Sequence, residues 1–425
     1  MRTFRVAFLV LSFVLVQTAS ALPALASAGD LDTSFSHDGL VLRKDIPGSI
    51  YSAVVQPDGK IVAAGVALGV DQPFRVMVAR FFPDGSLDRT FGVNGVVRTR
   101  FNGGAYAWSV ALAPDGDIVA GGSLTPPDGV GPTRFMIVRY LPNGSLDPAF
   151  SSDGKVHTHF GTGDASLYDL AVQPDGKVVA VGYTCCAVRT FAVARYLTDG
   201  SLDPGFGDHG KRMTAFTGSA GASGVALQAD GKIVVVGMRE VEGRRAAQGA
   251  VARYLSDGSL DATFGGDGRA ITHGRSFGGE DVALASDGGV MISGSLYALP
   301  TTTNTAAITR FTPEGVFDTS FGVDGFAGAD ISGGSDGNAI AVQPDGRIVM
   351  AATPWTGYRF LATRWNSDGT PDTGFGEDGV AGVQFPSGRC LADSIVLTTD
   401  GGVVLGGWAE VNGDGHAALA KFLGS

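Results

Sequence analysis

Residues 253–265 read RYLSDGSLDATFG, and five further segments of the chain follow the same pattern. Each of these six segments comes after an Asp-Gly turn, and a seventh such turn lies near the C-terminus. The turns recur every 55–60 residues, with their aspartates at Asp58, Asp115, Asp175, Asp230, Asp287, Asp345 and Asp400. A period of this length indicates a repeat protein in which each repeat is one supersecondary unit.

A seventh copy of the pattern is divided between the two ends of the chain. It begins at Lys421 and stops at Ser425, and its missing half runs from Gly29 to Gly39. An open stack of repeats requires capping units at its ends, and it gains nothing from a divided repeat. A closed ring, in which the N-terminal segment pairs with the last repeat, accounts for the division directly.

Each repeat has the pattern of four antiparallel strands. In the first repeat a tight turn is predicted at Pro57, Asp58 and Gly59, because these residue types favour such turns. The strands predicted around it are 52–55, 61–65, 74–82 and 96–100. Four-stranded units arranged in a ring form a β-propeller. The expected fold class is therefore all-β, a seven-bladed β-propeller of four-stranded antiparallel blades, closed by an N-terminal strand at 40–42 that completes the last blade.

The repeats resemble the delta-60 repeat of bacterial exported proteins. The resemblance rests on the hairpin QPDGKVVAVG at 173–182 and on RYLTDGSLD at 195–203. It covers the chain from residue 29 onward, and it is weaker in the fifth and sixth copies, which have VFD at 316–318 and TPD at 370–372. The resemblance implies a propeller-like repeat protein, and it supplies no catalytic residue.

Residues 1–28 have the pattern of a secretory signal peptide. Arg2 and Arg5 precede an apolar run at 6–16, and small residues suited to cleavage follow. The run is shorter than the ~20 residues of a membrane span. We therefore expect a single propeller domain at 29–425 that is exported to the periplasm or secreted, with no membrane span.

Charge and cysteine content limit the partners and the chemistry. The formal net charge of −11 repels phosphate backbones, so no nucleic-acid partner is expected. The three cysteines are Cys185, Cys186 and Cys390. A vicinal Cys185–Cys186 disulfide is one possibility in an oxidising compartment, and incidental thiols are the favoured alternative. The sequence leaves the disulfide state of all three open.

Two charged positions recur in every repeat and are therefore interpreted as scaffold. The basic position holds Arg80, Arg139, Arg195, Arg253, Arg310, Arg364 and Lys421, and the acidic position holds Asp88, Asp147, Asp203, Asp261, Asp318, Asp372 and Asp32. We predict one structural ion pair per blade, with Lys421 and Asp32 joining the two chain ends. Calcium in the Asp-Gly turns is a less favoured alternative, because the turns lack the alternating acidic spacing of a calcium loop.

Differences between the repeats identify the candidate ligand-binding face. The tight turns lie on one face of the ring and the longer, variable connections on the other, where scaffolds usually present ligand-binding residues. Among the residues expected around the channel mouth on the innermost strands, the candidate ligand-binding set is Tyr51, Trp108, Tyr168, Asp169, Glu280, Asp281, Asn338 and Asp393. Aromatic rings beside carboxylates and amides suit a sugar. The favoured alternative is that the rings plug the channel and the acids are merely solvated.

Two main functions remain open. No catalytic constellation is evident, so the leading hypothesis is a non-catalytic binding or scaffolding module at or outside the cell surface. It would be a monomer without a cofactor, and its partner would be a polysaccharide or a cell-surface protein. The second hypothesis is a glycosidase or lyase in which Glu280 works with Asp169 or Asp393 as paired carboxylates. A third is a structural protein stabilised by calcium.

Overall fold

The computed structural model describes residues 26–68, 74–127, 129–185, 188–241, 246–297, 304–329, 331–386 and 388–424. Over these ranges the regular secondary structure consists of strands. No helix in this part of the chain has the length and apolar character to cross a membrane. Most of the predicted signal peptide lies outside the described residues.

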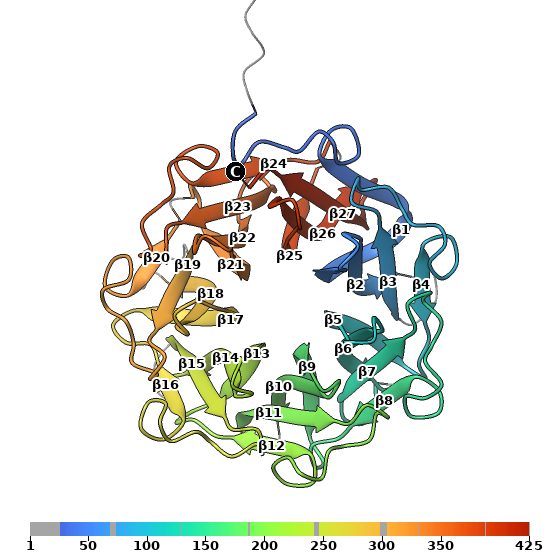
Figure 1. Cartoon of the computed structure of the whole chain (residues 1–425), viewed down its shortest axis with the longest axis vertical. Helices are drawn as coiled ribbons and strands as arrows, with labels where there is room; N and C mark the ends of the chain where they lie inside the picture. Colours follow the sequence, from blue (N-terminus) through green and yellow to red (C-terminus); the bar gives the residue numbers. More distant parts are fainter. Residues whose placement is uncertain are drawn as a thin grey trace, which may run out of the picture.

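Five sheets each contain four antiparallel strands that pair in chain order. They comprise β5 (Gly104–Leu112), β6 (Ile118–Thr125), β7 (Arg134–Tyr140) and β8 (Lys155–Thr158); β9 (Asp164–Val172), β10 (Val178–Cys185), β11 (Arg189–Tyr196) and β12 (Lys211–Thr214); β13 (Ala220–Leu227), β14 (Ile233–Glu240), β15 (Ala247–Tyr254) and β16 (Arg269–Ile271); β17 (Ser276–Leu284), β18 (Val290–Tyr297), β19 (Asn304–Phe311) and β20 (Phe326–Gly328); and β21 (Ser335–Val342), β22 (Ile348–Pro354), β23 (Phe360–Trp365) and β24 (Val380–Val383). The sheets stand around a common axis, with the first strand of each nearest to it (Figure 1).

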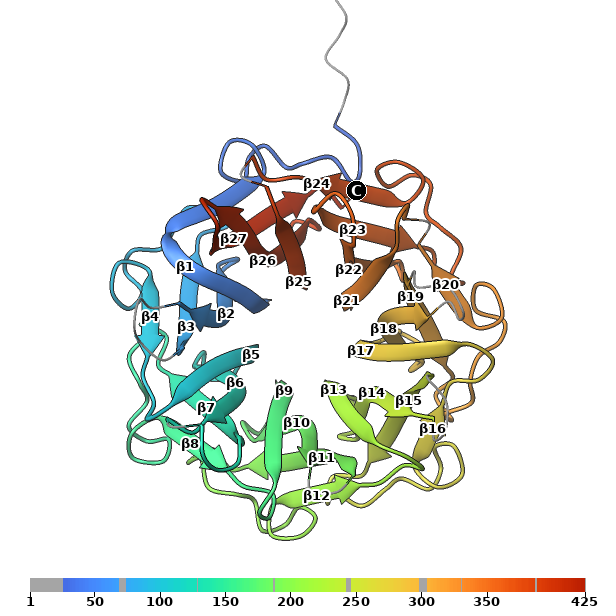
Figure 2. The ribbon, with the colours of Figure 1, turned by 180° about the vertical axis from the view of Figure 1, so that it is seen from behind.

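A sixth sheet joins the two ends of the chain. Its seven strands follow the order β25-β26-β27-β1-β2-β3-β4. Their bounds are β1 (Leu40–Val55), β2 (Ile61–Ala67), β3 (Arg75–Phe81), β4 (Val96–Thr99), β25 (Cys390–Leu397), β26 (Val403–Val411) and β27 (Asp414–Phe422). The 16-residue β1 pairs through Leu40–Leu42 with Ala418–Ala420 of β27, and from Gly48 onward with β2. The first and last strands of the chain therefore lie side by side, as both face-on views show (Figures 1 and 2).

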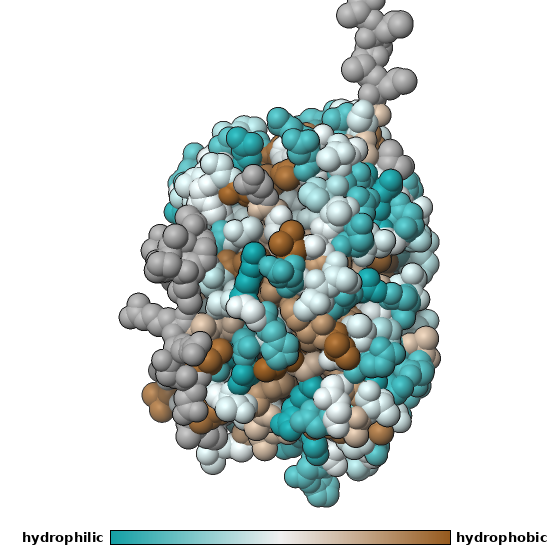
Figure 3. All heavy atoms as spheres, turned by 90° about the vertical axis from the view of Figure 1, so that its left-hand side faces the viewer, coloured by the Kyte–Doolittle hydropathy of each residue, from teal (hydrophilic) through white to brown (hydrophobic). Residues whose placement is uncertain are grey.

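The core lies between neighbouring sheets. The second strand of each sheet is rich in Val, Ile and Ala and is buried on both faces, as in β2, where all seven residues are buried. Val179 and Val181 of β10 pack in one apolar cluster with Ile233 and Val235 of β14. The rim, in contrast, mixes hydrophilic and hydrophobic side chains (Figure 3). Stability thus comes from burying each sheet against the next one.

The six predicted arginine–aspartate pairs are confirmed. The Nε–Oδ2 distance is 2.8 Å in Arg80–Asp88 and 2.9 Å in Arg253–Asp261. Several of these arginines also donate to a carbonyl about one repeat further along, as Nη1 of Arg253 does to Pro313 O at 2.5 Å. The arginine therefore ties its own strand 3–4 turn to the next sheet. In the divided repeat, Lys421 Nζ lies 2.8 Å from Asp32 Oδ2.

Replacing Arg253 with Met should lower the stability far more than the same change at Arg310. Both partners of the Arg253–Asp261 pair are buried, with side-chain exposures of 7% and 5%, so Asp261 would lose its main partner inside the protein. Removing one member of a buried pair costs about 3–5 kcal/mol. The Arg310–Asp318 pair is longer, at 3.6 Å, and more exposed, so its loss should cost about 1 kcal/mol or less.

Thermal denaturation of the two variants checks this prediction. The melting temperature should fall by several degrees for Arg253→Met and by about one degree for Arg310→Met. Equal effects would contradict the view that the buried pairs hold neighbouring sheets together.

Candidate functional site

A β-bulge occurs at the same place in each of the innermost strands. In β5, Ala107 pairs with Gly122 and Ser109 with Gly121, which leaves Trp108 as the extra residue. The extra residues of the seven innermost strands are Tyr51, Trp108, Tyr168, Ser223, Glu280, Asn338 and Asp393. A bulge redirects a side chain and is frequent beside functional sites. All the bulge residues are at least partly exposed.

A recurring glycine in the second strand makes room for the bulge. A Cβ atom added to Gly122 would lie 1.8 Å from Tyr106 O, and one added to Gly65 would lie 1.9 Å from Ser49 O. Such distances are impossible, so only glycine allows the inner strand to come this close. In the sixth repeat the glycine lies on the innermost strand instead, where Gly337 pairs with Ala352 of the second strand. The glycine of the QPDGKVVAVG-like hairpin thus helps to place the candidate ligand-binding residues.

The aromatic candidates form a continuous arc. The ring of Trp108 lies 4.4 Å from that of Tyr51 and 6.0 Å from that of Tyr168, measured between centroids. Tyr106 stacks on Trp108 at 5.8 Å, and Tyr183 extends the arc beyond Tyr168 at 5.9 Å. Sequence reasoning identified the three bulge residues and missed Tyr106 and Tyr183. We call the set Tyr51, Tyr106, Trp108, Tyr168 and Tyr183 the aromatic arc.

Asp169 and Asp281 have partners in the scaffold. Oδ2 of Asp169 accepts a hydrogen bond from Val225 N at 2.8 Å, and Oδ2 of Asp281 accepts one from Ile340 N at 3.0 Å. Each carboxylate therefore links its strand to the innermost strand of the following sheet. Ser109 has a related position and donates through Oγ to Asp169 Oδ1 at 2.7 Å. These contacts give both aspartates a structural role that the sequence did not reveal.

Glu280, Asn338 and Asp393 continue around the axis from the aromatic arc. Asn338 donates through Nδ2 to Ala392 O at 2.6 Å, which ties it to the next innermost strand. Burial raises the pKa of Glu280 to about 7, and the nearby charge of Asp336 adds to this rise. Burial raises the pKa of Asp393 to about 7 as well. Burial also raises the pKa of Asp169 and Asp281, and in Asp281 the charge of Asp169 adds to it.

Replacing Asp393 with Asn should stabilise the protein more at neutral and alkaline pH than at acidic pH. Oδ2 of Asp393 is buried and has no hydrogen-bond partner among the described residues. Because the folded pKa of about 7 exceeds the ordinary value of 3.8, the folded state keeps this proton longer than the unfolded chain does, and its stability falls as the pH rises from about 4 to 7. An amide avoids that loss, which is on the order of 2 kcal/mol after allowing for screening by water.

The measurement is the melting temperature at pH 5 and pH 8.5, with the exposed Asp378→Asn as the matched control. Asp393→Asn should melt a few degrees above the parent at pH 8.5 and much closer to it at pH 5, and the control should match the parent at both. A gain for Asp393→Asn that is equal at the two pH values would rule out the titration of this carboxyl as its cause.

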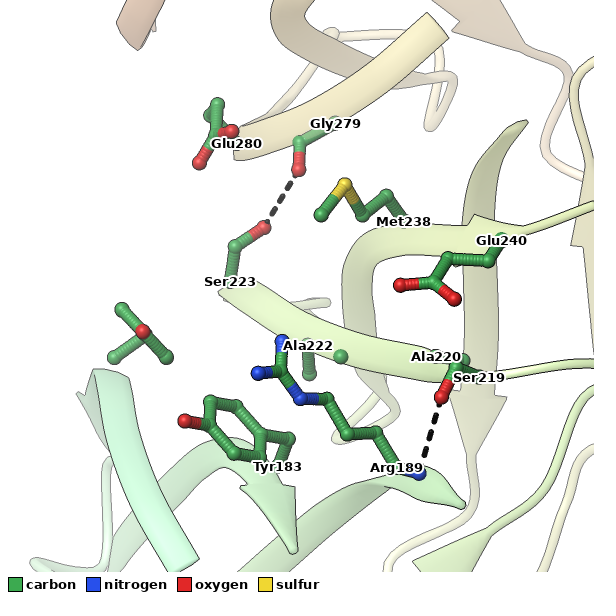
Figure 4. Close-up of a pocket in the computed structure, with 12 residues that line it drawn as sticks. Tyr183, Arg189, Ser219, Ala220, Ala222, Ser223, Met238, Glu240, Gly279 and Glu280 are labelled. Carbon is green, nitrogen blue, oxygen red and sulfur yellow. Dashed lines mark hydrogen bonds between the residues drawn. The ribbon is translucent and has the colours of Figure 1, made fainter. Parts of the chain in front are cut away.

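A cavity of about 210 Å³ adjoins the end of the aromatic arc. Its lining includes Tyr168, Tyr183, Arg189, Ser223, Glu240 and Glu280, which come from three successive sheets. The cavity opens on the face of the longer connections. Arg189 is the first residue of β11 and Glu240 is the last residue of β14, so both lie beside the connections that join β10 to β11 and β14 to β15. Figure 4 shows the guanidinium group of Arg189 beside the ring of Tyr183, with the carboxylates of Glu240 and Glu280 at other edges. Neither Arg189 nor Glu240 belongs to the recurrent charged positions or to the innermost strands, so the comparison of the repeats did not identify them.

The described residues contain no group of three His, Cys, Asp or Glu side chains placed to hold a metal ion. In the Asp-Gly turns the aspartate accepts a main-chain N–H two residues on, as Asp58 does from Lys60 N at 3.2 Å. Among the described residues, no disulfide joins Cys185 or Cys390 to another cysteine. Cys186 lies outside the described residues, and the proposed vicinal disulfide with it.

The comparisons with known proteins agree with the fold. The family model of the DUF5122 β-propeller, a domain of unknown function, matches residues 56–91, 113–150, 173–206, 228–264 and 343–375. No curated protein matches the chain.

Several solved structures resemble the chain at low sequence identity. The polysaccharide lyase Uly1 has a TM-score of 0.51 at 11% identity, with 88% of this chain and 90% of the lyase covered. A protein of unknown function from Dyadobacter fermentans has a TM-score of 0.48 at 13% identity, covering 91% of this chain and 100% of that one. The periplasmic gluconolactonase PpgL of Pseudomonas aeruginosa has a TM-score of 0.47 at 14% identity, covering 86% and 96%. The lyase likeness supports the β-propeller fold alone, and the family model supports a β-propeller repeat family for this chain.

Proposed function

We propose that this chain is an exported, non-catalytic β-propeller of the delta-60 type that binds a polysaccharide on the face of its longer connections. In this proposal the propeller is a monomer without a cofactor, and it acts in the periplasm or outside the cell. The proposal does not include the calcium-stabilised alternative, since Oδ1 of the turn aspartates accepts a main-chain hydrogen bond.

The proposal includes seven blades and a closed ring. The pairing of β1 with β27 becomes irregular between Leu42 and Pro47, which divides the seven-stranded sheet into two four-stranded halves that share β1. With the five four-stranded sheets, these halves give seven blades. Ile50 and Ile61 pack in one buried cluster with Val404 and Leu419, which supports a sealed contact between the first and last blades.

The aromatic arc is the observation that carries the binding proposal. Tyr51, Trp108 and Tyr168 come from three different innermost strands, and their rings touch in succession. They remain partly exposed instead of being buried in the core. Sugar C–H faces stack on such rings, while carboxylates and amides such as Glu280 and Asn338 suit the hydroxyl groups.

Main-chain hydrogen bonds favour a non-catalytic role for two of the candidate carboxylates. Asp169 and Asp281 are both engaged across blade boundaries, so neither is free to exchange protons with a substrate. One observation favours the glycosidase or lyase alternative: the raised pKa of Glu280, about 7, suits a general acid or base near neutral pH.

A thermal-shift screen of residues 29–425 against acidic and neutral polysaccharides tests the proposal. We expect at least one saccharide to raise the melting temperature, without release of reducing ends or unsaturated products on prolonged incubation. Products that disappear with Glu280→Gln would instead establish the enzyme. A screen in which no saccharide raises the melting temperature would contradict both hypotheses.

A further inference from the structure

Among the described residues that line the cavity at the end of the aromatic arc, the one cationic side chain is Arg189. The guanidinium carbon of Arg189 lies 4.7 Å from the ring centroid of Tyr183. Its main-chain N–H donates to Ser219 Oγ at 3.3 Å, which fixes the start of β11 at the edge of the cavity. Arg189 is thus held against a ring, and its side chain reaches into the space that Tyr168 also lines (Figure 4).

Arg189 differs from the arginines of the scaffold. Each scaffold arginine has an aspartate partner, such as Asp203 at 2.9 Å from Arg195. No ion pair within 4.0 Å joins Arg189 to a carboxylate of the described residues. Stacking occupies one face of a guanidinium group and leaves the N–H donors at its edge free. Those donors match the two oxygens of a carboxylate.

We propose that this cavity binds a uronic acid residue of an acidic polysaccharide, with Arg189 contacting the sugar carboxylate. The inference rests on the proposed function and specifies its substrate class. Tyr168 supplies the stacking surface that continues the aromatic arc into the cavity, and Glu240 and Glu280 are placed to contact hydroxyl groups. The volume of about 210 Å³ suits one sugar ring, while the neighbouring rings of the arc extend to further residues of the polymer.

The acidic side chains in the cavity are compatible with an anionic sugar. Glu240 is exposed to solvent, where water and salt screen its charge. Burial and the charge of Asp336 raise the pKa of Glu280 to about 7, which weakens the repulsion between this carboxyl and an anionic ligand near neutral pH. Arg189 then supplies the positive charge that the sugar carboxylate contacts.

Calorimetric titration with matched pairs of oligosaccharides tests the proposal. The probes are tetramers of galacturonate, mannuronate and alternating glucuronate–N-acetylglucosamine, each beside its methyl-esterified form. The variants are Arg189→Gln and the control Arg389→Gln, whose guanidinium group lies 4.8 Å from the ring of Tyr358 outside the cavity.

At least one acidic tetramer should bind the parent about tenfold or more tightly than its ester does, since a charge-assisted pair has roughly that value. Arg189→Gln should remove this preference, and Arg389→Gln should leave it unchanged. Equal affinity for acid and ester, or a preference that survives Arg189→Gln, would overturn the uronate proposal and leave polysaccharide binding in place. No binding of any acidic or esterified tetramer, together with no response to neutral polysaccharides in the thermal-shift screen, would instead refute the proposed function itself.

Discussion

Deleting residues 29–42 should leave a protein that no longer melts cooperatively above room temperature. Phe35 is completely buried, and losing a buried aromatic side chain costs about 3–5 kcal/mol. The deletion also removes Asp32, one of two carboxylates paired with the buried Lys421, and this adds a smaller cost because Asp400 remains. Together these losses approach the roughly 5–15 kcal/mol that stabilises a typical domain. In addition, β27 would become an unpaired edge, which favours aggregation.

Circular dichroism during heating measures this effect. The control is the chain beginning at Gly29, which should melt as one cooperative unit. A truncated protein that melts within a few degrees of this control would show that the N-terminal segment does not close the ring.

Replacing Trp108 with Ala should reduce polysaccharide affinity by about 30-fold or more. Trp108 is the centre of the aromatic arc, with the rings of Tyr51, Tyr106 and Tyr168 all within 6.0 Å. Aromatic side chains at the centre of a binding surface commonly contribute 2 kcal/mol or more. The melting temperature should change little by comparison, because Trp108 is partly exposed at a bulge and lies outside the core.

The matched control for this variant is Trp408→Ala, a partly exposed tryptophan on β26 outside the arc. Titration calorimetry of both variants with the saccharide that binds the parent gives the comparison. Unchanged affinity in Trp108→Ala would favour the alternative in which the rings only plug the centre of the propeller.

The repeats predicted much of the fold because every repeat obeys the same packing rules. The sheets, the arginine–aspartate pairs and the placement of 40–42 beside the C-terminal strand all follow from positions that recur in sequence. The innermost strands were less well predicted. The first of them was expected to begin at residue 52, whereas the pairing of β1 with β2 begins at Gly48. The preceding residues pair around a bulge, which breaks the alternation that marks a strand.

The candidate site was only partly accessible to sequence reasoning. The bulge residues could be aligned from repeat to repeat, so Tyr51, Trp108 and Tyr168 were found. The structural role of Asp169 depends on a main-chain N–H in the next repeat, about 56 residues further along, which no local pattern reveals. Tyr183 and Arg189 lie on the paired strands β10 and β11, on either side of a connection that differs between repeats, so comparison of the repeats did not reveal their contact.

Calorimetric titration of residues 29–425 with a series of acidic and neutral polysaccharides tests the central claim most directly. The account predicts saturable binding of at least one saccharide at one site per chain, with no change in the length of the polymer. Absence of binding to every polysaccharide in the series would contradict the assignment of the aromatic arc as a sugar-binding surface.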